Sequence, residues 1–124
     1  MVIFSHTIFY VKDILKSVAF YKNVFGFELK FMHESKQYAE LNTGATVIAF
    51  ASESLGDFNL SKGYIHNDIN QLPLASEVCF TVSDVQNFYK KALKAGAIAV
   101  APPQEKPWGQ TVAYVRDENY SDFL

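Results

Sequence analysis

Two side chains with metal-binding chemistry stand at matching positions of a repeated pattern. Glu77 lies 71 residues after His6, and each residue belongs to a run that alternates in apolar character. An imidazole and a carboxylate suit a divalent ion such as Zn²⁺, Fe²⁺, Mn²⁺ or Ni²⁺. A pair alone should bind such an ion weakly, because catalytic sites typically use three protein ligands. The alternative is a hydrogen-bonded pair with no cofactor, and the residues leave both possibilities open.

The two side chains belong to a segment that occurs twice. Residues 5–27 and 76–97 share the order of an alternating run, an aspartate and an amphipathic stretch that ends near a glycine. A period of two predicts a strand, and apolar residues at i, i+4 and i+7 predict a helix. The expected helix boundaries are Asp13 and Gly26 in the first copy and Asp84 and Gly96 in the second. The sequence therefore predicts two similar units.

Each copy continues with segments typical of strands, so we expect an α+β fold of two tandem β-α-β-β-β units. The first unit covers residues 1–52, with a strand over 2–11 and three further strands at 27–33, 37–41 and 45–51. Residues 53–73 hold glycines and polar residues and are expected to form a connecting loop, either a cover over a site or a linker. The second unit covers residues 74–124, with strands at 98–101 and 110–116 and a last strand, starting at Phe123, that is expected to be incomplete.

Composition narrows the class of partner. The 124 residues carry a formal charge of −2 and are 49% hydrophobic. Such a chain has enough material for one core, and it offers no basic field for nucleic acid or for an anionic membrane. The single cysteine, Cys79, allows no internal disulfide, and no apolar stretch reaches 18 residues, so we expect a cytoplasmic protein. A small molecule or another protein is the expected partner.

Four further residues are candidates for contacting a ligand. Tyr10 shares a predicted strand face with His6. Trp108, between a proline and a glycine, would act either as a loop anchor or as an aromatic wall of a site. Tyr114 and Arg116 alternate along one strand, so one face could present a phenol and a guanidinium to a carboxylate ligand. Arg116 could equally form a salt bridge with a nearby aspartate.

The order of these elements resembles the vicinal oxygen chelate superfamily, which contains glyoxalase I, bleomycin-resistance proteins, fosfomycin-resistance enzymes and extradiol dioxygenases. The resemblance rests on the paired units and on several short stretches. These are residues 20–21 and 24–27 near the end of the first predicted helix, residues 82–85, residues 107–110 and Arg116-Asp117. It implies a single glyoxalase-like domain over residues 1–124, in which the curled mixed sheet forms a cup with the helices outside. It also implies a homodimer.

The resemblance further implies where metal ligands would stand. His6 and Glu77 match the first-strand ligand positions of the two units, and Glu77 would be either a ligand or the catalytic base. Ala49 matches a third ligand position but cannot bind a metal, and the fourth position would lie beyond Leu124. We therefore expect a protein that binds a small molecule in the cup without a full metal site. The alternative is a metal-dependent lyase or isomerase, transferase or dioxygenase that uses His6 and Glu77.

Overall fold

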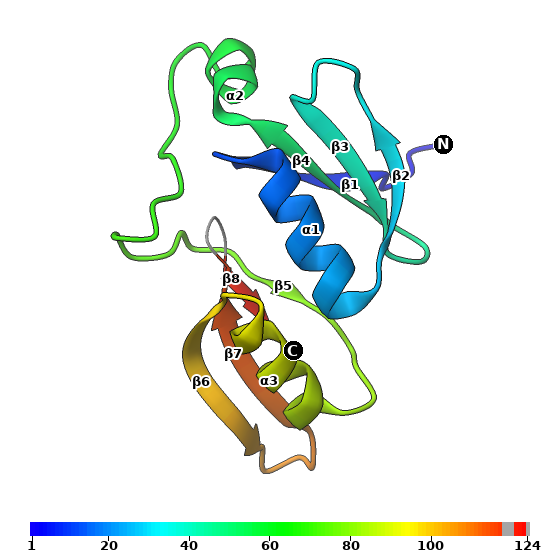
Figure 1. The fold of residues 1–124 in the computed structure, drawn as a ribbon, viewed down its shortest axis with the longest axis vertical. Helices are drawn as coiled ribbons and strands as arrows, with labels where there is room; N and C mark the ends of the chain where they lie inside the picture. Colours follow the sequence, from blue (N-terminus) through cyan, green and yellow to red (C-terminus); the bar gives the residue numbers. More distant parts are fainter. Residues whose placement is uncertain (118–120, 124) are drawn as a thin grey trace. The chain divides into compact units, whose positions relative to one another are not determined.

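The structure is a computed structural model that describes residues 1–117 and 121–123, with side chains described through residue 117. The chain divides into two compact units, residues 1–67 and 68–124. Each unit contains one four-stranded sheet (Figure 1). None of the three helices in the described ranges has the length and apolar character that crossing a membrane requires.

The first unit is a mixed sheet with two helices. Its strands are β1 (His6–Val11), β2 (Glu28–Met32), β3 (Tyr38–Asn42) and β4 (Val47–Ser52), and its helices are α1 (Ile14–Phe25) and α2 (Glu53–Asn59). The strand order is β1-β4-β3-β2. β1 and β4 run parallel, whereas β3 is antiparallel to both of its neighbours. The parallel pair needs a crossover, and α1 lies within that connection.

Helix α1 covers one face of this sheet (Figure 1). The Asp13 side chain accepts a hydrogen bond from the backbone N–H of Lys16, and Gly26 follows the helix in the left-handed region at φ 73°. The buried Tyr21 ring of α1 packs on the Phe50 ring of β4, with centroids 5.2 Å apart. The predicted helix and both of its boundary residues are confirmed.

The second unit repeats this topology. It consists of β5 (Val78–Cys79), α3 (Val85–Lys94), β6 (Ile98–Glu105), β7 (Thr111–Arg116) and β8 (Ser121–Phe123), in the strand order β5-β8-β7-β6. β5 and β8 are parallel, as β1 and β4 are. Asp84 caps α3 by accepting a hydrogen bond from the N–H of Asn87. The predicted α+β class, with two β-α-β-β-β units, is confirmed.

Several predicted boundaries were wrong. β1 begins at His6 rather than at residue 2, because its partner strand begins at Val47, which pairs with His6. β6 continues to Glu105 through two prolines, which an edge strand tolerates where its register shifts. β8 begins at Ser121, before the predicted Phe123. Residues 118–120 and the final residue, Leu124, lie outside the described residues.

The expectation of a loop throughout residues 53–73 was wrong for its first part, which forms α2. The Ser52 hydroxyl accepts a hydrogen bond from the Leu55 N–H and caps the helix, and Glu53 places a negative charge in the first turn. A helix of seven residues that contains a glycine is too short to show an amphipathic period. Packing against β1 and β4 supplies the support that its sequence lacks.

Candidate functional site

The face of the first sheet that points away from α1 carries several polar side chains, including His6, Tyr38 and Glu40. Phe50 packs on α1, so its neighbours in β4, Ala49 and Ala51, point to the opposite side. We call this side the distal face. Strand pairing arranges its side chains in three rows, which are His6 with Val47, Asn42 and Glu28; Ile8 with Ala49, Glu40 and Phe31; and Tyr10 with Ala51 and Tyr38.

The middle row of the distal face combines accessible apolar surface with one carboxylate. Ile8 is 41% exposed and Phe31 is 45% exposed, although both are large apolar residues. Ala49, between Ile8 and Glu40, has no exposed surface. Glu40 itself is half-buried. Apolar surface around a few polar groups is the usual composition of a small-molecule site.

Tyr38 and Glu40 form a polar pair on this face. The Tyr38 hydroxyl donates a hydrogen bond of 2.7 Å to Oε2 of Glu40. Burial, this hydrogen bond and the negative charge of Glu40 together raise the pKa of Tyr38 to about 12. The phenol therefore remains protonated at neutral pH and keeps donating to the carboxylate.

The third row ends under α2, where Tyr10 packs on the Tyr64 ring with centroids 5.3 Å apart. Gly56 of α2 lies against both rings, since a Cβ built there would be 2.5 Å from the Tyr64 hydroxyl and 2.9 Å from Tyr10 ring atoms. The Tyr64 hydroxyl donates to the carbonyl oxygen of Glu53. Burial and nearby acidic groups raise the pKa of Tyr64. Tyr10, a predicted ligand contact, thus packs on α2 and on the segment that follows it.

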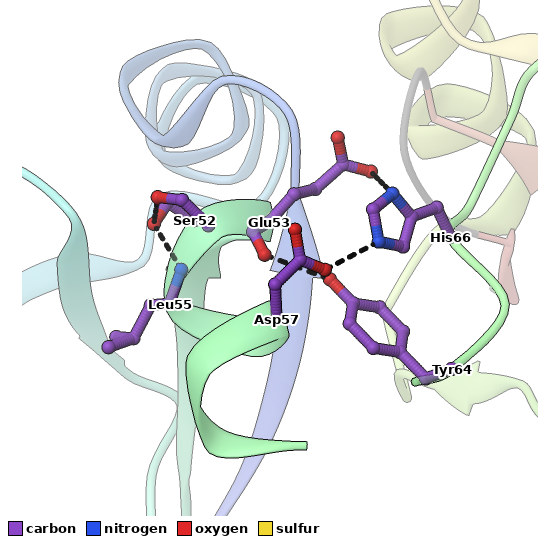
Figure 2. Close-up of polar contacts among 7 residues, drawn as sticks. Ser52, Glu53, Leu55, Asp57, Tyr64 and His66 are labelled. Atoms are coloured by element: carbon purple, nitrogen blue, oxygen red, sulfur yellow. Dashed lines mark hydrogen bonds and ion pairs between the residues drawn. The ribbon is translucent and has the colours of Figure 1, made fainter. Parts of the chain in front are cut away.

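His66 ties this following segment to α2 (Figure 2). Its Nε2 lies 2.9 Å from Oδ1 of Asp57, and its Nδ1 lies 3.3 Å from Oε2 of Glu53. The His66 ring also stacks near Tyr64 at 4.5 Å. Glu53 Oε2 is buried and has no hydrogen-bond partner in the described part of the chain, so its contact with His66 is an ion pair defined by distance.

The first unit does not assemble a metal site around His6. His6 is half-buried on the distal face and pairs in register with Val47, which cannot bind a metal. Ala49, one position further along β4, offers no ligand either. Across residues 1–117 and 121–123, no three His, Cys, Asp or Glu side chains are grouped as a metal site requires. These residues do not fit a complete catalytic metal centre, and a site shared by His6 and Glu77 remains a prediction.

The candidate residues of the second unit occupy different parts of it. Glu77 is exposed and directly precedes β5. In β5, Cys79 pairs with residue 123, which pairs with Tyr114, so Cys79 and Tyr114 lie on one face of the second sheet. Trp108 lies in the turn between β6 and β7, is 72% exposed and donates from its indole nitrogen to the Gln110 side chain. At this exposure the indole is not packed as a loop anchor, and its role as an aromatic wall of a site stays a prediction.

Arg116 anchors the segment that leads into the second unit. It is 7% exposed, and its two terminal nitrogens donate to the carbonyl oxygens of Asp68 and Gln71, each at 2.6 Å. A third contact, to the carbonyl of Ile69, is 3.5 Å long. The buried Nε has no hydrogen-bond partner in the described structure. The guanidinium, predicted to meet a carboxylate ligand, is thus engaged with backbone carbonyls.

Two residues of the distal face did not emerge from sequence reasoning. Tyr38 and Glu40 stand two positions apart in a predicted strand, so alternation alone would have placed them on one face. The missing information was which face α1 covers. The tyrosine and the glutamate at positions i and i+2 of a central strand were therefore the sequence pattern that could have predicted a polar pair on one face.

Comparison with known proteins identifies the family. The model of the Glyoxalase/Bleomycin resistance protein/Dioxygenase superfamily matches residues 3–120, and the chain belongs to this superfamily. The predicted resemblance is therefore confirmed. The structure is also similar to a glyoxalase-related enzyme from Fulvimarina pelagi, with a TM-score of 0.84 and 16% identity over 99% of this chain and 86% of that chain.

Two further relatives show how widely the fold is used. The fosfomycin resistance protein FosX from Mesorhizobium loti has a TM-score of 0.69 and 16% identity, covering 100% of this chain and 91% of that chain. A 4-hydroxyphenylpyruvate dioxygenase from Dictyostelium discoideum is 31% identical over 114 residues. This match covers 82% of the chain but only 29% of the dioxygenase. The structural likenesses establish the fold alone, because one fold hosts many activities.

Proposed function

We propose that the chain binds a small organic molecule on the distal face of its first sheet, without a full metal site. The observation that carries this proposal is the middle row, where exposed Phe31 lies beside the half-buried carboxylate of Glu40 and exposed Ile8 lies one strand further, beyond Ala49. Large exposed apolar side chains gathered on a sheet face indicate a binding surface. Membership of a superfamily whose description includes bleomycin resistance proteins supports this function.

A neutral aromatic probe tests the proposal. We expect 2-phenylethanol to bind the full chain in buffer with EDTA, as measured by the change in NMR chemical shifts during a titration. Phe31→Ser should weaken this binding at least about threefold, because removal of the ring takes away apolar contact area. Phe58→Ser is the matched control, since Phe58 is 80% exposed on α2. Equal effects of the two substitutions would overturn the proposal, as would failure of this probe and of its amine and carboxylate analogues to bind the wild type.

The second candidate function is a metal-dependent enzyme that uses His6 and Glu77. It is favoured by the position of His6 on the same face and by the likeness to a dioxygenase. A metal there would act as a Lewis acid on bound oxygen atoms of a substrate. Metal analysis of protein purified without chelator, with thermal shifts in Zn²⁺, Mn²⁺, Ni²⁺ and Fe²⁺, separates the candidates. Near-stoichiometric metal, with stabilisation that is lost in both His6→Ala and Glu77→Ala, would establish this alternative.

We also propose that the protein forms a homodimer. β2 and β6 are edge strands of their sheets and carry exposed apolar side chains, namely Leu29 on β2 and Ile98 and Val100 on β6. Pairing between copies would cover such edges. Sedimentation at micromolar concentration should give twice the 14.0 kDa chain mass. A species of 14.0 kDa would contradict the dimer.

A further inference from the structure

Glu40 is a half-buried carboxylate that has no cationic partner among the described residues of the first unit. Its single hydrogen bond comes from the neutral Tyr38 hydroxyl and reaches only Oε2. The described ion pairs of the first unit join His66 to Glu53 and Asp57 and do not include Glu40. Partial removal from water weakens the solvation of the charge, so a positive group beside Glu40 would be favourable. The second oxygen of Glu40 is therefore available to a positive charge or a second donor.

The cross-strand neighbours of Glu40 supply neither group. Ala49 and Phe31 flank it in the middle row, and neither side chain has a hydrogen-bond donor. Tyr38 holds one oxygen at 2.7 Å, which restricts the orientation of the carboxylate. The free oxygen is thus held in place beside apolar surface, which is a suitable arrangement for recognising a ligand.

The aromatic neighbours specify the sign of the ligand's charge. The Phe31 ring is 45% exposed beside Glu40, and its centroid is 6.4 Å from that of Tyr38. Aromatic ring faces attract cations, and a carboxylate next to them adds a full negative charge. An anionic ligand group would meet repulsion from Glu40, and a purely apolar ligand would leave the carboxylate without a partner.

We propose that Glu40 is the ligand-recognition residue of the distal face and that the ligand carries a cationic nitrogen, an ammonium or a guanidinium, on an aromatic or apolar body. The proposal rests on the proposed function, since it names the class of molecule that the same face would bind. The nitrogen would donate to the free oxygen of Glu40 while the body of the ligand contacts Phe31 and Ile8.

Three probes of similar size and shape test the charge preference, which are 2-phenylethylamine, 2-phenylethanol and phenylacetate. Each is titrated into the full chain in buffer with EDTA, and the dissociation constant is taken from NMR chemical shifts. We expect the dissociation constant of the amine to be about ten- to one-hundredfold lower than that of the alcohol. The reason is that a hydrogen bond between charged groups stabilises a complex by about that factor. Phenylacetate should bind most weakly.

Glu40→Gln should abolish the advantage of the amine over the alcohol while leaving alcohol binding within about threefold of wild type. Glu34→Gln is the matched control, because Glu34 is exposed in the turn between β2 and β3 and loses the same charge. If Glu40→Gln does not fold, the order of the three probes on wild type still decides the question. Equal binding of amine and alcohol would overturn the role of Glu40 and leave the site intact. Failure of all three probes to bind would overturn both proposals.

Discussion

Replacing Arg116 with methionine should destabilise the chain by about 3 kcal/mol. Two short hydrogen bonds from the guanidinium to backbone carbonyls would be lost, and each charge-assisted bond contributes about 1.5–3 kcal/mol. The lower value of this range applies, because the freed carbonyl oxygens can accept hydrogen bonds from water. In addition, the substitution removes the buried Nε, which has no hydrogen-bond partner in the described structure. The 3.5 Å contact to Ile69 adds little at its length. Methionine keeps most of the apolar stem, so packing changes less than hydrogen bonding.

Urea unfolding followed by circular dichroism measures this loss. With a slope of about 2 kcal/mol per M, the midpoint should fall by about 1.5 M. Arg116→Lys should give a smaller decrease, because one ammonium cannot reproduce the two-pronged geometry. The same variants should bind phenylacetate as wild type does. A stable Arg116→Met variant with weakened phenylacetate binding would refute this reasoning and restore the predicted role of Arg116 in recognising a carboxylate.

Three further perturbations test the first unit. The pKa of Tyr38 is raised to about 12, so the unfolded protein releases this proton near pH 10 while the folded protein keeps it. The stability that Tyr38 contributes should therefore decline as pH rises from about 10 through 12. Absorbance at 295 nm should show a late-titrating phenol that Tyr38→Phe removes. Gly56→Ala should lower the free energy of unfolding by about 1 kcal/mol, as measured by thermal unfolding. The clash of the new methyl group with Tyr64 costs about 1–3 kcal/mol, which exceeds the gain in helix propensity of about 1 kcal/mol. A raised Tm would contradict this packing. His66→Asn should cost less than about 1 kcal/mol in urea, since the ion pairs are partly exposed, and a cost that persists unchanged in 1 M NaCl would argue against an electrostatic contribution.

The elements that could be predicted from the sequence are those determined by local chemistry. Asp13 and Gly26 mark the two ends of α1 through hydrogen bonds to residues no more than four positions away. Their residue types therefore predict the helix without knowledge of the rest of the fold. The repetition of the same pattern around Asp84 then predicts the second unit. The boundary of β1 depended instead on where its partner strand begins, at Val47, which no local pattern contains.

The candidate site was harder to predict because its properties come from contacts distant in sequence. The Arg116 guanidinium meets carbonyls 45–48 positions earlier in the chain, which alternation along β7 cannot reveal. Likewise, α2 is supported by Tyr10 and Tyr64 around Gly56, whereas its own sequence favours a loop. Glu40 became a candidate only when α1 was seen to cover the opposite face of the sheet.

The most direct test of the central claim is a map of backbone amide chemical shifts during titration of the full chain with 2-phenylethanol in EDTA. We predict saturable changes that are largest at Ile8, Phe31, Glu40 and Ala49, the middle row of the distal face. Changes that concentrate under α1 or in residues 68–117, or that appear only after a divalent metal is added, would contradict metal-independent binding on this face.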